Sequence, residues 1–555
     1  MNCIKSKILC LGILTVSYVN ASHAEISATD ILNMLVDEGI LSEEKVKQLV
    51  DKARTKNESS EQESNSSKNP SHTSTVRVPY IPNYIKDDIS SSVKEEVLDD
   101  IKPEIIEHVR ATGWGIKEAP EWVYRTSISG DVRVRYSGEF YPNDNPTDPI
   151  FDIDETNDAG GVANGSRDII LNLTDDRQRL RGRARLMFTS RPSENLEVGI
   201  RLTSGNSGNP VSANQTLGKY GKKWESSFDL AYFNYTSDAK TFGFEAGRFK
   251  NPWLHSDLIW DSDMTFEGIN TTYAPMRSKS TTRMFDPYIQ IGAFPLQEIH
   301  QAILPGDSVD PPNDDKWLYA GQLGTNINFS ENSVISFAVS YFYFKNVVGV
   351  DNPINQDNQD LTASSYYQYG NTLQNIVAND PFNSTQRELY ALASEFELLN
   401  LTLRYDYSGF DEHHLWFMAD KVENKAFDSQ EVSKRIGVGF IVPDRSSGYE
   451  LGLGFGSKKT NGWGDWQLGF NYRYLEGDAV IDAFADSDFL LGGTNAKGYI
   501  LKGDLWLADN LSVSFRWLSA EEIDAADVPD PLNPGQFIVS DIEVDTFFLD
   551  LNAKF

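Results

Sequence analysis

The feature that most constrains this chain is an alternation of apolar and polar residues that continues to its last residue. In the segment 545–555 every second residue is apolar, ending at Phe555, and most residues between them are polar. A repeat of two residues is the side-chain period of a β-strand with one apolar and one polar face.

The same alternation occurs in many earlier segments, including 128–136, 180–188, 196–202, 466–474 and 511–517. A soluble β-sandwich is an alternative for a few such strands. Two features favour a membrane barrel instead. Aromatic residues lie near the strand ends, as interfacial girdles require, and tight turns alternate with long polar loops. Because lipid offers no hydrogen-bond partners, such a sheet must close on itself.

The pattern predicts an all-β transmembrane antiparallel barrel of about sixteen strands. The predicted strands lie near 127–140, 177–190, 195–204, 225–236, 240–249, 266–274, 283–293, 317–329, 333–344, 388–408, 413–421, 448–457, 464–476, 497–508, 511–519 and 545–555. An alternative count of eighteen follows if 388–408 holds a hairpin and 433–441 is a further strand. An even number is expected when both ends of the barrel lie on the same side of the membrane.

The first residues have the pattern of a secretory signal peptide, 1–24. Lys5 and Lys7 precede a short apolar run, and small residues before Ala24 predict cleavage there. The run is too short to span a bilayer as a helix, and no later apolar run reaches about 18 residues. Both cysteines lie inside this peptide, so the mature chain is expected to have no disulfide and no thiol chemistry.

Three segments are expected between the signal peptide and the barrel. The residues 25–57 predict a helical hairpin, and 58–75 form a polar, disordered linker. The residues 76–120 predict a short α-helical periplasmic segment whose apolar stripe also fits a coiled coil, although Pro103 indicates a break. The barrel is expected over 121–555.

The composition excludes several classes of function. The formal net charge of −31 argues against a nucleic-acid partner, which requires a basic surface. The chain has no Gly-x-Ser-x-Gly elbow, no His-Glu-x-x-His motif and no phosphate loop. His413 and His414 point to opposite faces of a strand and do not share one site. We therefore expect no enzyme activity, no cofactor and no metal. The acidic loop 141–176 departs from the EF-hand pattern and is expected to be solvated, with weak divalent-cation binding at the lipopolysaccharide surface as the alternative.

Arginines dominate the side of the early strands that is expected to face the lumen. Because barrels of about sixteen strands enclose an aqueous channel, charges on this side set selectivity. Two compatible readings remain open: a basic wall that guides anions or the acidic end of a zwitterion, and a ladder paired to acids of an inserted loop. The arginines predicted to line the pore are Arg133, Arg135, Arg181, Arg183, Arg185 and Arg201, with Arg248 before the next loop.

A constriction loop is predicted at 250–266, after the fifth strand. It contains Asp257, Asp261 and Asp263. Acids opposite an arginine wall would create a transverse field that favours small polar solutes over apolar ones. The alternative is an ordinary extracellular loop.

Several motifs, taken in order, resemble the putative porin family of Gram-negative outer membranes. They include Ser-Gly-Asp-Val-Arg-Val-Arg-Tyr at 129–136, Gly-Arg-Phe-Lys-Asn-Pro at 247–252, Trp-Asp-Ser-Asp at 260–263 and Asp-Ser-Asp-Phe at 486–489. The resemblance covers most of 25–555. It implies an outer-membrane β-barrel pore and names no solute.

The sequence therefore predicts an outer-membrane porin for passive diffusion of small hydrophilic solutes. The alternative is a structural or adhesive protein with a plugged barrel, tethered to the cell wall through its N-terminal helices. The expected partners are outer-membrane lipid and lipopolysaccharide, the barrel-assembly machinery that reads Phe555, a homotrimer of the chain, and peptidoglycan at the N-terminal segment. That segment is expected in the periplasm.

Overall fold

The computed structural model describes the unit that begins at Glu121 and ends at Phe555. The described residues are 121–147, 149–165, 169–276, 284–300, 314–352, 357–377, 387–437, 441–460, 462–524, 528–529, 537–538 and 541–555. The predicted signal peptide, helical hairpin, linker and periplasmic helix all lie outside them. Within the described part, no helix is both long and apolar enough to cross a bilayer.

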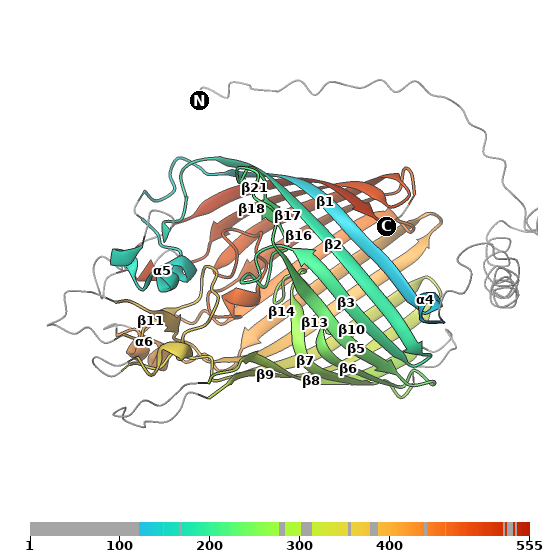
Figure 1. Cartoon of the computed structure of the whole chain (residues 1–555), viewed down its shortest axis with the longest axis horizontal. Coiled ribbons are helices and arrows are strands. Elements are labelled where there is room, and N and C mark those ends of the chain that lie inside the picture. The colour runs from blue at the N-terminus through green and yellow to red at the C-terminus, as the bar shows by residue number, and fades with distance from the viewer. Residues whose placement is uncertain are drawn as a thin grey trace, which may run out of the picture. The chain divides into compact units, whose positions relative to one another are not determined.

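Sixteen antiparallel strands form a closed barrel, because the last strand pairs with the first (Figure 1). The strands are β1 (Thr126–Phe140), β2 (Arg177–Ser193), β3 (Leu196–Ser204), β5 (Ser226–Thr236), β6 (Phe242–Lys250), β7 (Thr265–Tyr273), β8 (Phe285–Gln297), β9 (Lys316–Ser330), β10 (Ser333–Lys345), β13 (Phe396–Phe410), β14 (His413–Asn424), β15 (Ser447–Ser457), β16 (Trp466–Leu475), β17 (Ala496–Ala508), β18 (Leu511–Glu522) and β21 (Glu543–Lys554). Beyond β21, the backbone of Phe555 exchanges two hydrogen bonds with Gly130 of β1. The predicted closed barrel of sixteen strands is confirmed.

One predicted strand begins too early. The prediction of a wall strand over 388–408 is wrong in its first part, because β12 (Tyr390–Leu392) pairs with β11 (Leu373–Asn375) in a separate two-stranded sheet. The apolar run there gives a true strand, but all three residues of β12 are buried under other loops rather than in the wall.

The alternative count of eighteen is also wrong. Residues 433–435 belong to the helix α6 (Ser429–Arg435) and not to a strand. Asp428 caps this helix by accepting hydrogen bonds from the backbone N–H groups of Gln430 and Glu431, which is a common helix-start signal.

The two ends of the barrel differ (Figure 1). The short-turn end carries the helix α4 (Glu121–Tyr124), the C-terminus and tight connections such as 194–195, 331–332 and 509–510. The long-loop end carries the long connections with their small elements. These elements are α5 (Ile153–Ala159), α6, the 3₁₀ turns η1 (Val162–Asn164), η3 (Asp360–Thr362) and η4 (Asp482–Phe484), and the short strands β4 (Gln215–Thr216), β11, β12, β19 (Val528–Pro529) and β20 (Phe537–Ile538).

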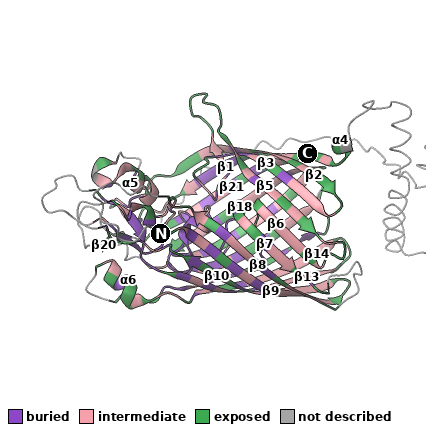
Figure 2. Cartoon of the chain, turned by 60° about the horizontal axis from the view of Figure 1, so that its bottom comes forward, coloured by how far each residue is buried: buried purple, intermediate pink, exposed green. Residues whose placement is uncertain are grey.

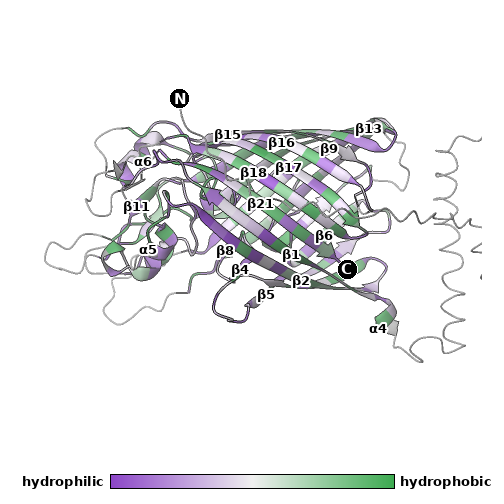
Figure 3. Cartoon of the chain, turned by 90° about the horizontal axis from the view of Figure 1, so that it is seen from above, coloured by the Kyte–Doolittle hydropathy of each residue, from purple (hydrophilic) through white to green (hydrophobic). Residues whose placement is uncertain are grey.

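The outer face of the wall is apolar and the inner face is polar. Along the strands hydrophobic and hydrophilic residues alternate (Figure 3). On β1, for example, Val132 and Val134 are each 46% exposed, whereas Arg133 and Arg135 between them are buried. An exposed apolar band around a closed sheet is the arrangement that a bilayer requires.

Buried residues gather in the long-loop half of the barrel (Figure 2). The largest apolar cluster joins wall residues such as Phe294, Phe342 and Phe396 to residues of the connections, among them Trp260 and Ile481. The long connections thus fold inward and fill part of the lumen, so the remaining passage runs past their polar sides.

Candidate functional site

A ladder of arginines covers the inner face of β1 and β2. Because side chains alternate along a strand, Arg133 and Arg135 share the inner face with Arg181, Arg183 and Arg185. The register sets Arg133 opposite Arg183 and Arg135 opposite Arg181. Five guanidinium groups at this spacing repel one another unless carboxylates or other anions lie between them.

Carboxylates of the wall separate several of these charges. Asp131 of β1 accepts from Arg183 Nη2 at 2.9 Å and from Arg185 Nε at 2.7 Å. Asp550 of β21 accepts from Arg135 Nε at 2.7 Å and Nη2 at 2.8 Å, a bidentate pair. Such bidentate pairs are the stronger kind of charge-assisted hydrogen bond and fix the guanidinium plane.

The segment 251–264, which joins β6 to β7, folds into the barrel. Its side chains Trp253 and Trp260 are 4% and 0% exposed and contact Phe342 edge-on. Gln322 of β9 exchanges hydrogen bonds of 3.1 and 3.0 Å with the backbone of Leu254. Burying each large aromatic side chain stabilises this position by about 2 kcal/mol. Packing on β9 and β10 thus directs the acidic part of the segment toward the arginines.

A second inward segment, 476–495, joins β16 to β17 and meets the first. The N–H of Asp261 donates to Phe484 O at 2.8 Å, and the N–H of Ser487 donates to Asp261 Oδ2 at 2.9 Å. Burial and the nearby negative charge of Asp486 raise the pKa of Asp261 well above its ordinary value. Asp261 therefore joins the two loops through hydrogen bonds with both.

The acids of both segments face the arginines. Asp263 Oδ1 lies 3.3 Å from Arg183 Nη1 and 3.4 Å from Arg185 Nη1. Asp488 Oδ2 accepts from Arg135 at 3.2 Å and from Arg516 of β18 at 2.8 Å. Burial would raise the pKa of Asp488, but the positive charges of Arg135, then Arg516, lower it below its ordinary value.

The site also contains a buried charge network that the prediction did not include. Arg473 of β16 is buried and donates from Nε to Glu450 at 2.7 Å and from Nη1 to Asp486 at 2.9 Å. Strand alternation already puts Arg473 on the polar face of β16, but only the fold brings Asp486 to it. Burial would raise the pKa of Asp257, but the positive charge of Lys502, then Arg473, lowers it.

Two predicted pore residues lie away from this cluster. Arg201 of β3 faces the lumen and forms a bidentate pair with Asp229, with Nη2–Oδ2 at 2.7 Å. Arg248 lies on the opposite face of β6 from the buried Phe249 and donates to Glu267 of β7 at 2.7 Å. This outward placement corrects the predicted pore position of Arg248: the residue was counted from the loop rather than from the strand's alternation.

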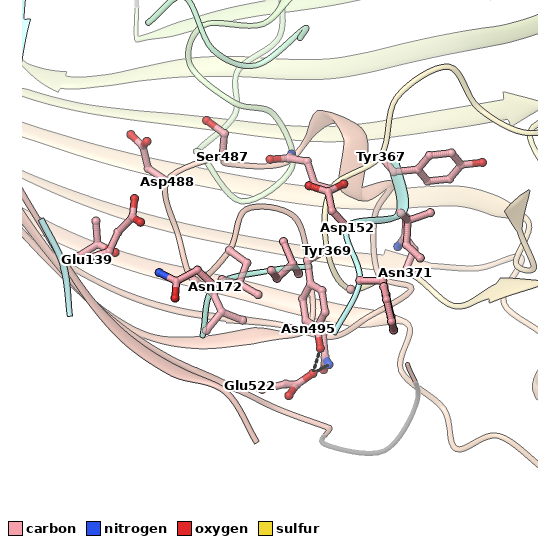
Figure 4. Close-up of a pocket in the computed structure, with 18 of the residues that line it drawn as sticks. Glu139, Asp152, Asn172, Tyr367, Tyr369, Asn371, Ser487, Asp488, Asn495 and Glu522 are labelled. Carbon is pink, nitrogen blue, oxygen red and sulfur yellow. Dashed lines mark hydrogen bonds between the residues drawn. The ribbon is translucent and has the colours of Figure 1, made fainter. Parts of the chain in front are cut away.

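The passage between these charges is narrow. A gap of about 40 Å³ is lined by Arg133, Arg135 and Arg516 on one side and by acids of the two segments on the other. Toward the long-loop end it meets a polar chamber of about 440 Å³ (Figure 4). Toward the short-turn end lies a space of about 570 Å³ lined by Asp131, Arg201 and others. In the described residues, no group of three or more His, Cys, Asp or Glu side chains could hold a metal ion.

A closed barrel with an apolar outer band and a charged, partly open lumen defines a transmembrane pore protein. The chain belongs to the putative porin family, whose sequence pattern matches residues 25–555. It is an outer-membrane porin.

Known structures with a similar barrel share little sequence with it. OprB of Pseudomonas putida is 11% identical, with a TM-score of 0.41 over 78% of this chain and 94% of that chain. The outer membrane channel DcaP of Acinetobacter baumannii is 10% identical, with a TM-score of 0.38 over 78% and 97%. The anion-selective porin from Comamonas acidovorans is 10% identical, with a TM-score of 0.37 over 78% and 99%. No curated protein sequence matches the chain.

Proposed function

We propose that this porin allows passive diffusion of small hydrophilic solutes and filters them at the gap between the arginine wall and the two inward segments. The observation that carries the proposal is the opposition of Arg133, Arg135 and Arg516 to Asp263 and Asp488 across about 40 Å³. Opposed charges at a narrow point create a transverse field that orders water and disfavours apolar solutes.

The size of the gap supports a filter for small species. A space of about 40 Å³ holds on the order of three water molecules. Ions and small polar solutes pass such a gap by exchanging water for contacts with the charged side chains. We infer that the segment 250–266 acts as the constriction loop, and that the barrel performs no enzymatic reaction.

The residues assigned to this filter come from three strands and two loops. The wall residues are Arg133, Arg135, Arg181, Arg183, Arg185 and Arg516, and the facing acids are Asp257, Asp263, Asp486 and Asp488. In this proposal Arg201 belongs to the wider space below the gap, and Asp261 holds the two loops together.

A second candidate is the plugged structural or adhesive barrel. The observation that favours it is the apolar cluster that fills much of the long-loop half of the lumen. The two candidates differ in permeability. Liposomes that contain the purified protein swell in a size-dependent way in solutions of small sugars if the pore is open, and do not swell if it is plugged.

The first experiment is single-channel recording of the refolded full-length protein in a planar bilayer under a salt gradient. We expect steady conductance and an anion-selective reversal potential, because the four arginines Arg133, Arg135, Arg181 and Arg516 surround Asp488 at the chamber side of the gap. A reversal potential that indicates cation selectivity would show that the arginine wall does not set the selectivity of the pore. Silence from protein shown to be folded would overturn the pore itself.

The remaining assignments concern position in the cell. We propose that the long-loop end faces outward toward lipopolysaccharide, that Phe555 is read by the barrel-assembly machinery, and that three copies of the chain associate. The N-terminal segment would then lie in the periplasm, where peptidoglycan is its proposed contact. Crosslinking of intact cells tests both the trimer and the peptidoglycan contact.

A further inference from the structure

Four arginines gather where the gap opens into the chamber. The arginines Arg133, Arg135, Arg181 and Arg516 all surround Asp488. Asp550 is bound by Arg135, and Asp486 lies 3.8 Å from Arg516 but is bound more closely, at 2.9 Å, by Arg473. Asp488 and Asp550 thus form their close hydrogen bonds with Arg135 and Arg516, and neither makes one with Arg133 or Arg181.

Arg133 and Arg181 are the two of these arginines that have no closely bound carboxylate. The nearest carboxylate oxygen to Arg133 is Asp550 Oδ2, 3.9 Å from Nη1, and no carboxylate of the described residues lies within 4.0 Å of Arg181. The Nε atoms of both arginines are buried without a hydrogen-bond partner, and Arg133 is only 9% exposed. Buried cationic donors without an anion are costly, so they favour an anion that arrives from solution.

An ordered loop holds both arginines in place with neutral groups. The short strand β4 pairs with β2 next to Arg181, and this pairing fixes the preceding residues beside the ladder. Asn214 Oδ1 accepts from Arg133 Nη2 at 2.6 Å, and Ser212 Oγ lies 3.4 Å from Arg181 Nη2 and 3.4 Å from Asn214 Nδ2. The four side chains form one continuous polar network. It orients the two guanidinium groups without neutralising them.

The space beside this network suits a solute with hydroxyl groups. Arg181 and Ser212 line the chamber of about 440 Å³, which is within the usual size range of small-molecule sites. The other lining groups include the amide of Asn209 and the phenol of Tyr366, which are joined at 3.0 Å. Figure 4 shows the side chain of Asn172 in the same lining, together with the carboxylates Glu139, Asp152 and Glu522. Arg133 and Asn214 line the gap itself, so the two arginines stand at its entrance.

Building on the proposed function, we propose that Arg133 and Arg181 form a binding subsite for the carboxylate or phosphate group of a small hydroxylated solute. The anionic group binds both arginines through charge-assisted hydrogen bonds, and the hydroxylated part stays among the amide and phenol groups of the chamber. The solute then enters the gap with its anionic group leading. Uncharged sugars of the same size lack the group that the arginines hold.

The test is block of single-channel potassium chloride current by solutes added on the long-loop side. Gluconate and glucose 6-phosphate are expected to reduce the current in a saturable way, whereas glucose at the same concentration does not. Arg181→Gln is expected to weaken this block about tenfold, because one charge-assisted contact is lost. Comparison of gluconate with glucose 6-phosphate shows which anionic group the subsite prefers.

Arg404→Gln is the matched control. It also removes one positive charge from the inner wall, but Arg404 lies on β13 and pairs with Asp406 at 2.8 Å. If Arg181→Gln and Arg404→Gln weaken the block by the anionic solutes equally, the subsite is overturned and the block is a general effect of positive charge on the wall. Block by glucose as strong as by gluconate would overturn it as well.

Calorimetric titration of the folded protein in detergent with glucose 6-phosphate separates this inference from the proposed function. Saturable heat that Arg181→Gln weakens supports the subsite even if the barrel conducts no current. Absence of saturable heat in wild-type protein of full conductance overturns the subsite and leaves the diffusion pore intact.

Discussion

The two sides of the lumen are built on different physical principles. On the side of β8, β9, β10 and β13, wall residues such as Phe294, Leu318 and Phe396 are at most 2% exposed and pack directly on the inserted segments. On the side of β1, β2, β18 and β21, arginines and carboxylates meet at 2.7 to 3.4 Å around a gap. The apolar side excludes water, and the charged side retains it.

This difference shows how a barrel can hold its loops firmly and still keep a passage. Apolar burial is non-directional and fixes the segment 251–264 against one wall. Ion pairs are directional and exchange with water and solutes, so they suit the side along which solutes move. A change on the apolar side should therefore alter the size of the passage, and a change on the charged side should alter its selectivity.

The largest effect is expected from Trp260→Ala on the apolar side. The indole is fully buried among aromatic rings, so its loss should cost about 4 kcal/mol of stability. The loosened segment should withdraw from the gap and raise single-channel conductance. Trp463→Ala, at a side chain that is 79% exposed, is the control and should change neither quantity. Unchanged conductance in Trp260→Ala would show that the segment does not set the passage width.

The next largest effect is expected from Asp488→Asn on the charged side. Removing this carboxylate leaves Arg135 and Arg516 without one of their anionic partners, at a cost of about 3 kcal/mol. The additional positive charge should move the reversal potential in a salt gradient toward the chloride equilibrium potential, which means stronger anion selectivity. Asp411→Asn, in an exposed turn, should leave the reversal potential as in wild type. A shift toward potassium would contradict the arrangement of charges described above.

A further effect concerns pH and the loops on the apolar side. Burial raises the pKa of Asp482 from 3.8 to about 8, and one of its oxygens has no hydrogen-bond partner. The folded state thus keeps a proton that the unfolded chain releases above pH 3.8. Stability should fall by about 1 kcal/mol per pH unit between these two pKa values and stay level above pH 8. Urea unfolding at pH 5, 7 and 9 measures this slope.

Asp482→Asn provides the matched comparison for that slope. The amide cannot ionise, so the part of the pH dependence that comes from residue 482 should disappear. Asp509→Asn, in an exposed turn, should keep the wild-type slope. If Asp482→Asn and wild type show the same slope, the buried carboxyl does not account for the pH dependence.

The smallest effect is expected from Arg248→Gln. The side chain pairs with Glu267 on the outer face of the wall, away from both sides of the lumen. Conductance and reversal potential should match those of wild type. Arg183→Gln, which removes a lumen arginine from the same sheet, should shift the reversal potential toward potassium. A selectivity change in Arg248→Gln would place its charge in the permeation path.

The sequence alone determined the barrel wall. A repeat of two residues is a local property. Within each strand, the apolar residues mark the face that contacts lipid and the polar residues mark the face that contacts water. Alternation therefore located β1, β2 and their arginines, and turn lengths separated the two ends. It failed where local pattern and tertiary role differ: β12 has a strand's apolar run but lies outside the wall.

Only the tertiary structure decided which charges meet. Arg135 and Asp550 are separated by 415 residues and become neighbours because the last strand closes on the first. Asp488 reaches the arginines because Phe484 of its own loop packs on Trp260 of the other inward segment, a contact that the sequence around Asp488 does not specify. Because of these pairings, Arg133 and Arg181 have no closely bound carboxylate. Local periodicity therefore determines the strands of the wall, whereas contacts between residues distant in the sequence determine which charged side chains line the passage.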